Sequence, residues 1–283
     1  MCRIVMNRKI ALLIGINYFG TTHSLNGCIN DILNMKKMLI TKRGYSERDI
    51  IVLRDDSVNP KQRPTKNNII SSIYQVIAQC KKEPGLREVW IHYSGHGSNL
   101  ADADGDEADS LDECIVPSDW EDNGVISDDV LQYYLRFIPS RVKCLCLFDS
   151  CHSGTVLDLQ YTYEPGSGPE TGTWVQKNNK ILNNNIILLS GSRDDQLSND
   201  IWLDDEQYMY YFKQPQFVGA MTASFLLTID KFKYTLTLRD LVLGMRSFMT
   251  ENSYLQTPQL SSSKQYDSSM YLSVDKNTPS FLS

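Results

Sequence analysis

Short apolar runs separated by longer amphipathic stretches constrain the fold of this chain more than any other feature. Four runs are apolar on both faces, as strands covered from both sides must be: residues 9–16, 87–93, 142–149 and 185–191. Apolar residues at three and four spacing predict five helices: residues 30–40, 67–80, 128–137, 220–232 and 238–249. This order predicts an α/β fold, with a mostly parallel central sheet and helices on both faces.

The chain is long enough for a sizeable core, with 283 residues of which 41% are hydrophobic. It contains no internal repeat and no break in composition, so we expect a single domain over residues 1–283. Residues 257–260 are expected to complete the edge of the sheet. For the aromatic, Pro-interrupted residues 208–217, part of the core and a loop beside the cleft are both open, and a mobile loop is favoured.

Charge and cysteine content exclude several classes of partner. The formal net charge is −6, and the acids gather in residues 102–113 and 194–206, which favours cations and argues against nucleic acid. Seven irregularly spaced cysteines indicate free thiols in a reducing, cytoplasmic environment. Nowhere do about 18 apolar residues occur together, so no membrane span is expected.

Three loops at the expected strand ends carry the reactive side chains. They are residues 17–31, 94–99 and 149–155, and none contains a phosphate-binding glycine motif. Ligands of open α/β sheets bind beyond the carboxyl ends of the strands, so these loops are expected to meet at one edge.

His96 and Cys151 each follow one of these strands and are expected to face each other across a cleft. A free thiol has a pKa of about 8.5, and a nearby imidazole favours the nucleophilic thiolate. The imidazole can then protonate a leaving amine, which is the chemistry of a cysteine peptidase. Buried structural roles remain open for both residues.

Two other chemistries use the same residue types. Zinc would need a ligand set that lacks a C-x-x-C pair here: His92, His96, Cys151 and His152. A thiolate phosphatase would need an arginine soon after the cysteine, and residues 151–160 contain none.

The motifs "HYSGHGS", "FDSCHSGT" and "GCIND" closely resemble those of the metacaspases, cysteine peptidases related to the caspases. The resemblance runs from about residue 9 to residue 263 and includes "DECIVPSD", "DLQYTYE" and "SGSRDDQLSND". It implies a caspase-like three-layer sandwich with a p20-like part (residues 1–163), a loop (164–184) and a p10-like part (185–283). It also implies a monomer that cleaves protein or peptide substrates.

By that resemblance, His96 and Cys151 are the catalytic dyad, and the N–H groups of Gly97 and Cys151 form the oxyanion hole. The peptide bond is cleaved through a thioester, after Arg or Lys. The residues implied for the S1 pocket, which holds that side chain, are Cys28, Asp31, Ser94 and Asp149. Taken from the residues alone, Asp31 could equally cap a helix and Asp149 could be a turn acid.

The acidic tract raises the question of a metal. Residues 102–113 have acids at EF-hand spacing, but Glu107 stands where a glycine is required, so a solvated loop is expected there. The resemblance implies instead a Ca²⁺ site that activates the enzyme, with four ligands: Asp112, Asp128, Asp129 and Asp158. Asp128 and Asp129 are also well placed as first-turn acids of a helix.

Other expectations concern regulation. Type I metacaspases usually carry an N-terminal extension, whereas about eight residues precede the first expected strand, as in a bare type I catalytic core. Lys177 and Lys180 are possible self-cleavage sites in an exposed loop that could equally be an ordinary basic loop. The alternative function is an inactive binding module that keeps the fold and does no chemistry.

Overall fold

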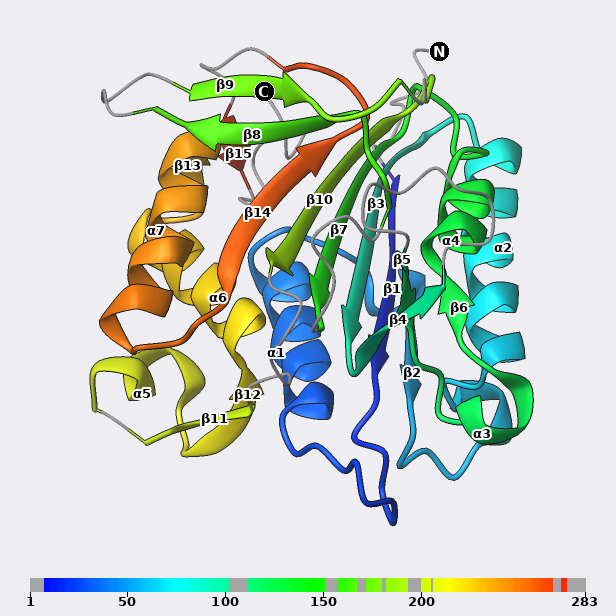
Figure 1. Cartoon of the computed structure of the whole chain (residues 1–283), viewed down its shortest axis with the longest axis horizontal. Coiled ribbons are helices and arrows are strands. Elements are labelled where there is room, and N and C mark those ends of the chain that lie inside the picture. The colour runs from blue at the N-terminus through cyan, green and yellow to red at the C-terminus, as the bar shows by residue number, and fades with distance from the viewer. Residues whose placement is uncertain are drawn as a thin grey trace, which may run out of the picture.

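Eight strands form one mixed sheet that organises the described part of the chain (Figure 1). The computed structural model describes residues 8–101, 111–150, 157–166, 172–179, 182–192, 200–204, 206–266 and 271–273. Only the backbone is described at residues 100, 101, 111, 112, 192, 207, 209 and 210. The strands of this sheet are β1 (Arg8–Gly15), β2 (Ile50–Arg54), β3 (Leu86–Ser94), β7 (Lys143–Asp149), β8 (Tyr161–Pro165), β9 (Gly172–Gln176), β10 (Asn185–Ser192) and β14 (Thr257–Ser262).

The strand order is β2-β1-β3-β7-β10-β14-β8-β9, and the first five strands run parallel. All four strands predicted from double apolar faces are present in this parallel part. Alternate residues of β1 face opposite layers: Ala11 and Leu13 pack on one side, Ile10 and Leu12 on the other. The double coverage inferred from the sequence is therefore confirmed.

Helices cover both faces of the sheet, and all five predicted helices are present. They are α1 (Cys28–Thr41), α2 (Lys66–Lys82), α3 (Trp120–Asn123), α4 (Asp128–Leu135), α5 (Glu206–Phe212), α6 (Ala220–Lys231) and α7 (Leu238–Glu251), with 3₁₀ turns η1 (Glu47–Asp49) and η2 (Pro60–Gln62). The helices α1, α6 and α7 cover one face, and α2 and α4 cover the other (Figure 1). Ser127 accepts a hydrogen bond from Val130 N and so begins α4, as its sequence predicts. None of the described helices is long and apolar enough to cross a membrane.

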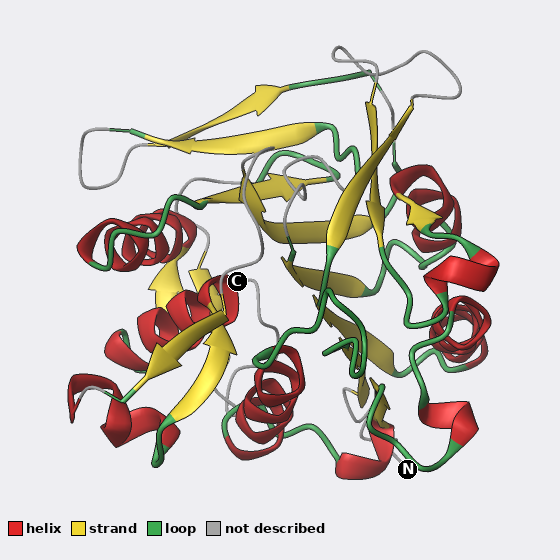
Figure 2. Cartoon of the chain, turned by 60° about the horizontal axis from the view of Figure 1, so that its bottom comes forward, coloured by secondary structure: helices red, strands yellow, loops and turns green. Residues whose placement is uncertain are grey.

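Three small sheets flank the large one. They are β4 (Gly97–Ala101), β5 (Leu111–Ile115) and β6 (Ile126–Ser127); β11 (Asp200–Leu203) and β12 (Gln216–Gly219); and β13 (Thr235–Thr237) and β15 (Tyr271–Ser273). Figure 2 turns the carboxyl ends of the parallel strands towards the viewer, and helices lie on both sides of the sheet in this view.

Three segments differ in part from what the sequence predicts. Residues 208–217 do not form the favoured loop, because they contain most of α5 and the start of β12, and Phe212 is buried in the core, which was the other possibility. The expected loop at residues 164–184 contains β9, which pairs with β8 at the edge of the sheet. Residues 257–260 belong to β14, which lies inside the sheet between β10 and β8 because that hairpin takes the edge.

Candidate active site

His96 is the described centre of the candidate active site. It follows β3, and its backbone is fixed by a hydrogen bond from His96 N to Tyr18 Oη (2.9 Å) and one from Tyr93 Oη to its carbonyl (2.6 Å). Its ring lies 4.6 Å from the Tyr18 ring, centroid to centroid. A side chain held in this way loses little freedom when it acts on a bound group.

The His96 ring nitrogens have different roles. His96 Nε2 lies 2.6 Å from the carbonyl oxygen of His23, and since a carbonyl only accepts, Nε2 carries the proton. Burial lowers the pKa of His96 more than the His23 carbonyl raises it, so the ring is neutral at pH 7. Neutral imidazole with a proton on Nε2 has a lone pair on Nδ1, which is the atom able to take a proton.

Cys151 and His152 lie outside the described residues, but the strands before them are described. In the parallel pair β3–β7, Ser94 stands opposite Asp149, and Gly95 N donates to the Asp149 carbonyl (3.2 Å). His96 and Cys151 are each two residues past this pair along the chain. The register therefore directs both chain segments to the same edge.

Asp31 and Asp149 come together at the start of α6. Asp31 is fully buried and accepts hydrogen bonds from Gly219 N (2.8 Å) and Ser94 Oγ (2.6 Å). Asp149 is 2% exposed and accepts from Thr222 N (2.7 Å) in the first turn of α6. Asp149 therefore takes the helix-capping role that was considered for Asp31, and the helix that it caps, α6, lies far along the chain.

Burial makes this carboxylate pair hard to ionise. It raises the pKa of Asp149 to about 6, and it raises the pKa of Asp31 well above its ordinary value, with a further contribution from the Asp149 charge. Gly219 is required by the close approach of the pair, because a Cβ there would overlap the Asp149 carboxylate and lie 2.7 Å from Asp31 Oδ2. Cys28 is also buried beside the pair, and burial raises the pKa of its thiol. The four S1 candidates therefore lie close together.

Asp200 is a third acid near this pair that sequence reasoning missed. Its carboxylate accepts hydrogen bonds from Asn26 N and from Gly27 N (3.1 Å), immediately before α1. Its charge raises the pKa of Asp31, Asp149 and His96. The only signal in the sequence is its place at the end of "SGSRDDQLSND", because its partners lie more than 170 residues earlier.

The acids expected to bind Ca²⁺ come from segments that converge on α4. Cys114 of β5 pairs with Ser127, so the Asp112 backbone lies close to the start of α4, where Asp128 and Asp129 are. Gln132 Nε2 donates to the carbonyl of Leu157 (3.0 Å), which brings Asp158 to the same helix. The Asp112 side chain is not described. Among the described residues, no three His, Cys, Asp or Glu side chains form a group able to hold a metal ion.

The other candidate residues are placed as follows. His92 is buried in β3 with Nε2 3.1 Å from Thr222 Oγ1, and burial lowers its pKa to about 3, so it is a neutral core residue whose Nε2 already has a protein partner. Lys177 is exposed, and its ammonium lies 3.8 Å from Glu164 Oε1. Lys180 and most of the acidic tract lie outside the described residues. The described cysteines are all free thiols, as expected.

Comparisons of the sequence with protein families and with individual relatives point to the same family. Residues 9–160 match the family described as metacaspase, peptidase C14 domain. Metacaspase-1 of Kluyveromyces lactis is 33% identical over 93% of this chain and 68% of its own, and Metacaspase-1 of Meyerozyma guilliermondii is 34% identical over 92% and 70%. Metacaspase-1A of Neurospora crassa is 33% identical over 93% of this chain and 64% of its own.

Two solved structures show the fold. A protein from Geobacter sulfurreducens superposes with a TM-score of 0.60 at 23% identity, over 92% of this chain and 95% of that one. Caspase-1 from Spodoptera frugiperda gives 0.53 at 11% identity, over 90% and 85%. The caspase-like α/β fold expected from the sequence is therefore confirmed.

Proposed function

The chain belongs to the metacaspase family of cysteine-type peptidases, and on this premise we propose that it is an endopeptidase that cleaves after Arg or Lys. Cys151 is the nucleophile and His96 its acid–base partner. The observation that carries the proposal is the buried Asp31–Asp149 pair at the carboxyl ends of β3 and β7, the strands that His96 and Cys151 follow in sequence.

Nδ1 of His96 is the atom proposed to take the thiol proton. The Cys151 thiolate attacks the substrate carbonyl carbon, and the resulting tetrahedral intermediate collapses to a thioester as His96 gives its proton to the leaving amine. Water, deprotonated by His96, then releases the acid product and the thiol. The hydrogen bond from His96 Nε2 to His23 stabilises the charged ring between these steps.

Gly97 N is proposed to stabilise the oxyanion together with Cys151 N. Val116 N donates to the His96 carbonyl (3.2 Å). Antiparallel pairs alternate between bonded and non-bonded, so the next pair, Gly97 with Ile115, has no ladder bonds. This alternation directs the Gly97 N–H away from β5, which supports its availability to a substrate.

The Asp31–Asp149 pair is proposed to hold the guanidinium or ammonium group of the substrate. Burial makes both carboxylates hard to ionise while no cation is bound. A bound cation stabilises the charged form of each, so the pair is suited to bind one. Gly219 covers the pair, so binding requires the end of β12 to move. Asp200 adds a third negative charge and holds the start of α1 in place.

Ca²⁺ is the proposed activator, held by Asp112, Asp128, Asp129 and Asp158. Carboxylate oxygens from separate segments suit this hard cation, and the convergence of these segments on α4 supports the assignment. The ion would neutralise the acids and order the adjoining segments. Calorimetric titration of the Asp128→Asn variant with Ca²⁺ tests the ligand set without reference to activity.

Lys177 and Lys180 remain proposed self-cleavage sites, and a monomer in the cytoplasm is the proposed state.

Fluorogenic peptides that end in Arg, Lys or Asp, assayed with and without Ca²⁺, test the proposed function. We expect the Arg and Lys peptides to be cleaved at least about 100-fold faster than the Asp peptide, and only with Ca²⁺, since an acidic side chain would meet two carboxylates. The Cys151→Ala variant is the blank. Faster cleavage of the Asp peptide would contradict the specificity, and an unchanged rate after chelation would contradict the role of Ca²⁺.

A further inference from the structure

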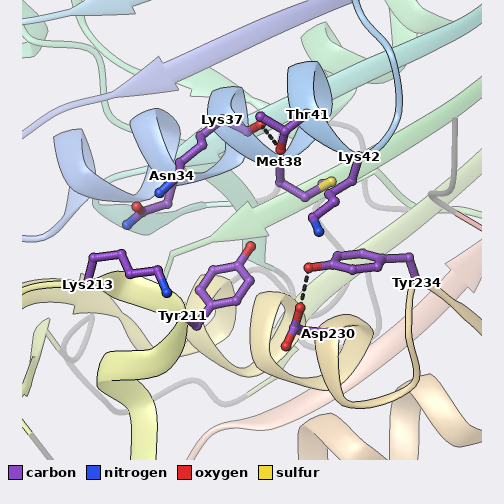
Figure 3. Close-up of a pocket in the computed structure, with 9 residues that line it drawn as sticks. All are labelled: Asn34, Lys37, Met38, Thr41, Lys42, Tyr211, Lys213, Asp230 and Tyr234. Carbon is purple, nitrogen blue, oxygen red and sulfur yellow. Dashed lines mark hydrogen bonds between the residues drawn. The ribbon is translucent and has the colours of Figure 1, made fainter. Parts of the chain in front are cut away.

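A cavity of about 200 Å³ lies between the C-terminal half of α1, the turn from α5 to β12 and the end of α6 (Figure 3). It is at the opposite end of α1 from Cys28 and Asp31 and shares no residue with the candidate active site. A water molecule occupies about 30 Å³ of liquid, so the cavity can take a small organic molecule.

The charges that line the cavity differ in sign from those of the whole chain. Among the described residues that line it are three lysines, Lys37, Lys42 and Lys213, and one carboxylate, Asp230, which accepts a hydrogen bond from the Tyr234 hydroxyl. The described lining therefore carries a formal net charge of about +2 in a protein of formal net charge −6. A cavity of this kind favours an anion.

Aromatic rings form part of the wall. The Lys42 ammonium lies 4.5 Å from the centroid of the Tyr234 ring, which holds it at the cavity. In Figure 3 the Lys213 side chain extends towards Tyr211, whose ring projects towards α1. Cations and flat rings around one space suit a ligand with an anionic group and a compact carbon part.

We propose that this cavity binds a small organic phosphate, with the phosphoryl group among the three lysines and the carbon part against Tyr211 and Tyr234. A phosphate monoester carries about −1.5 to −2 charges near pH 7, which matches the lining. Lysine ammonium groups bind phosphate as point charges and need no fixed fork geometry.

The cavity is mechanically connected to the Asp31–Asp149 pair. Asn34 donates to Gln216 Oε1 (3.1 Å) and so ties α1 to the first residue of β12. β12 ends at Gly219, whose N–H donates to Asp31. A ligand that binds Lys37 and Lys42 at the end of α1 together with Lys213, which precedes β12, therefore fixes β12 relative to α1. It thereby changes how closely Gly219 covers the Asp31–Asp149 pair. This second effect rests on the proposed function, whereas the binding does not.

Calorimetric titration of the full chain with phenyl phosphate and with inorganic phosphate tests the site. We expect saturable binding of both, tighter for phenyl phosphate. The pair Lys37→Gln and Lys42→Gln should raise both dissociation constants at least about tenfold, since two charge-assisted contacts are lost. The matched control is Lys61→Gln with Lys82→Gln, two exposed lysines elsewhere with the same change in net charge. Tyr211→Ala should weaken phenyl phosphate more than inorganic phosphate.

The outcomes separate binding from its effect on activity. No saturable binding to the wild-type chain, or equal weakening in the control pair, overturns the site. Saturation with phenyl phosphate should change KM for an Arg peptide in the wild type and not in the Lys37/Lys42 variant. An unchanged KM at saturation overturns the connection to the active site. An absence of any peptidase activity would contradict the proposed function and leave the titration result as it stands.

Discussion

The two ends of α1 carry side chains of opposite kind, an acid at the start and bases at the end, in opposite surroundings. At its start, Asp31 is fully buried and hydrogen-bonded, and at its end Lys37 and Lys42 are exposed. Asp31 lies in the first turn, where the helix dipole favours an acid, and Lys42 is the residue that follows the helix, where the dipole favours a base. The difference is desolvation: a buried charge is costly and needs specific partners, whereas an exposed one costs little. Substitutions at the buried end should therefore have much larger effects.

The largest effect is expected from Asp31→Asn or Asp149→Asn. Each removes one of the two carboxylates proposed to hold the substrate cation, so kcat/KM for an Arg peptide should fall about 10³-fold, as for other buried charge pairs that lose one partner. The Asp31→Asn side chain keeps an oxygen acceptor for Gly219 N, so the fold should be retained. The control is alkylation of Cys151 by neutral iodoacetamide, which should proceed at a similar rate. A loss of alkylation equal to the loss of peptidase activity would show that the acids act on the dyad and not on the substrate.

The same pair predicts a pH-dependent change in stability in the absence of substrate. The pKa of Asp149 is raised to about 6, so the folded state keeps a proton that the unfolded chain releases near pH 4. Its contribution to stability is therefore present below about pH 4 and is lost as the pH rises through 6. Asp149→Asn removes this titration and should increase the free energy of unfolding at pH 8, relative to wild type, by on the order of 2 kcal/mol. Denaturant unfolding at pH 4 and pH 8 measures it, and a gain of equal size at both pH values would contradict the cause.

Asp200 is an intermediate case in this comparison, because it is only partly buried and its charge acts on the Asp31–Asp149 pair without being part of it. Asp200→Asn removes its charge and keeps an acceptor for Asn26 N and Gly27 N, so KM for an Arg peptide should rise about tenfold with little change in kcat. Without its charge, the pKa of Asp149 should fall, and the acid limb of kcat/KM should move to lower pH. A residue that only positions the start of α1 would leave that limb in place.

How much of the fold could be predicted from the sequence depends on whether the interactions that fix each feature are local or join residues far apart in the chain. The run at residues 142–149 is apolar on both faces whatever it pairs with, so its position in the centre of a sheet could be predicted. α5 and β12 were missed because Pro215 and clustered aromatics obscure the period, and β12 pairs with β11 in a two-stranded ribbon.

In the candidate site, too, local features could be predicted and contacts between distant residues could not. His96 could be selected because it follows a strand between two glycines. The pairing of Ser94 with Asp149, which lie two residues before His96 and Cys151, depends only on adjacent parallel strands. The proton on Nε2 could not be predicted, because its acceptor is a backbone carbonyl of a distant loop. The protonation tendency of Asp31 is equally invisible in sequence, because Gly219 and Asp149 approach it only in the folded chain.

The smallest effect is expected at the exposed end of α1. The Lys37→Gln and Lys42→Gln pair removes two charges near the helix C-terminus, each worth about 0.3–1 kcal/mol at low ionic strength, so the free energy of unfolding should fall by about 1 kcal/mol. Salt screens exposed charges with a Debye length of about 10 Å at 0.1 M, and the difference from wild type should shrink at 1 M NaCl. The stability change of Asp149→Asn should keep most of its size in the same salt, because its charge is buried. Equal salt sensitivity at the two sites would mean that burial does not separate the two ends of the helix.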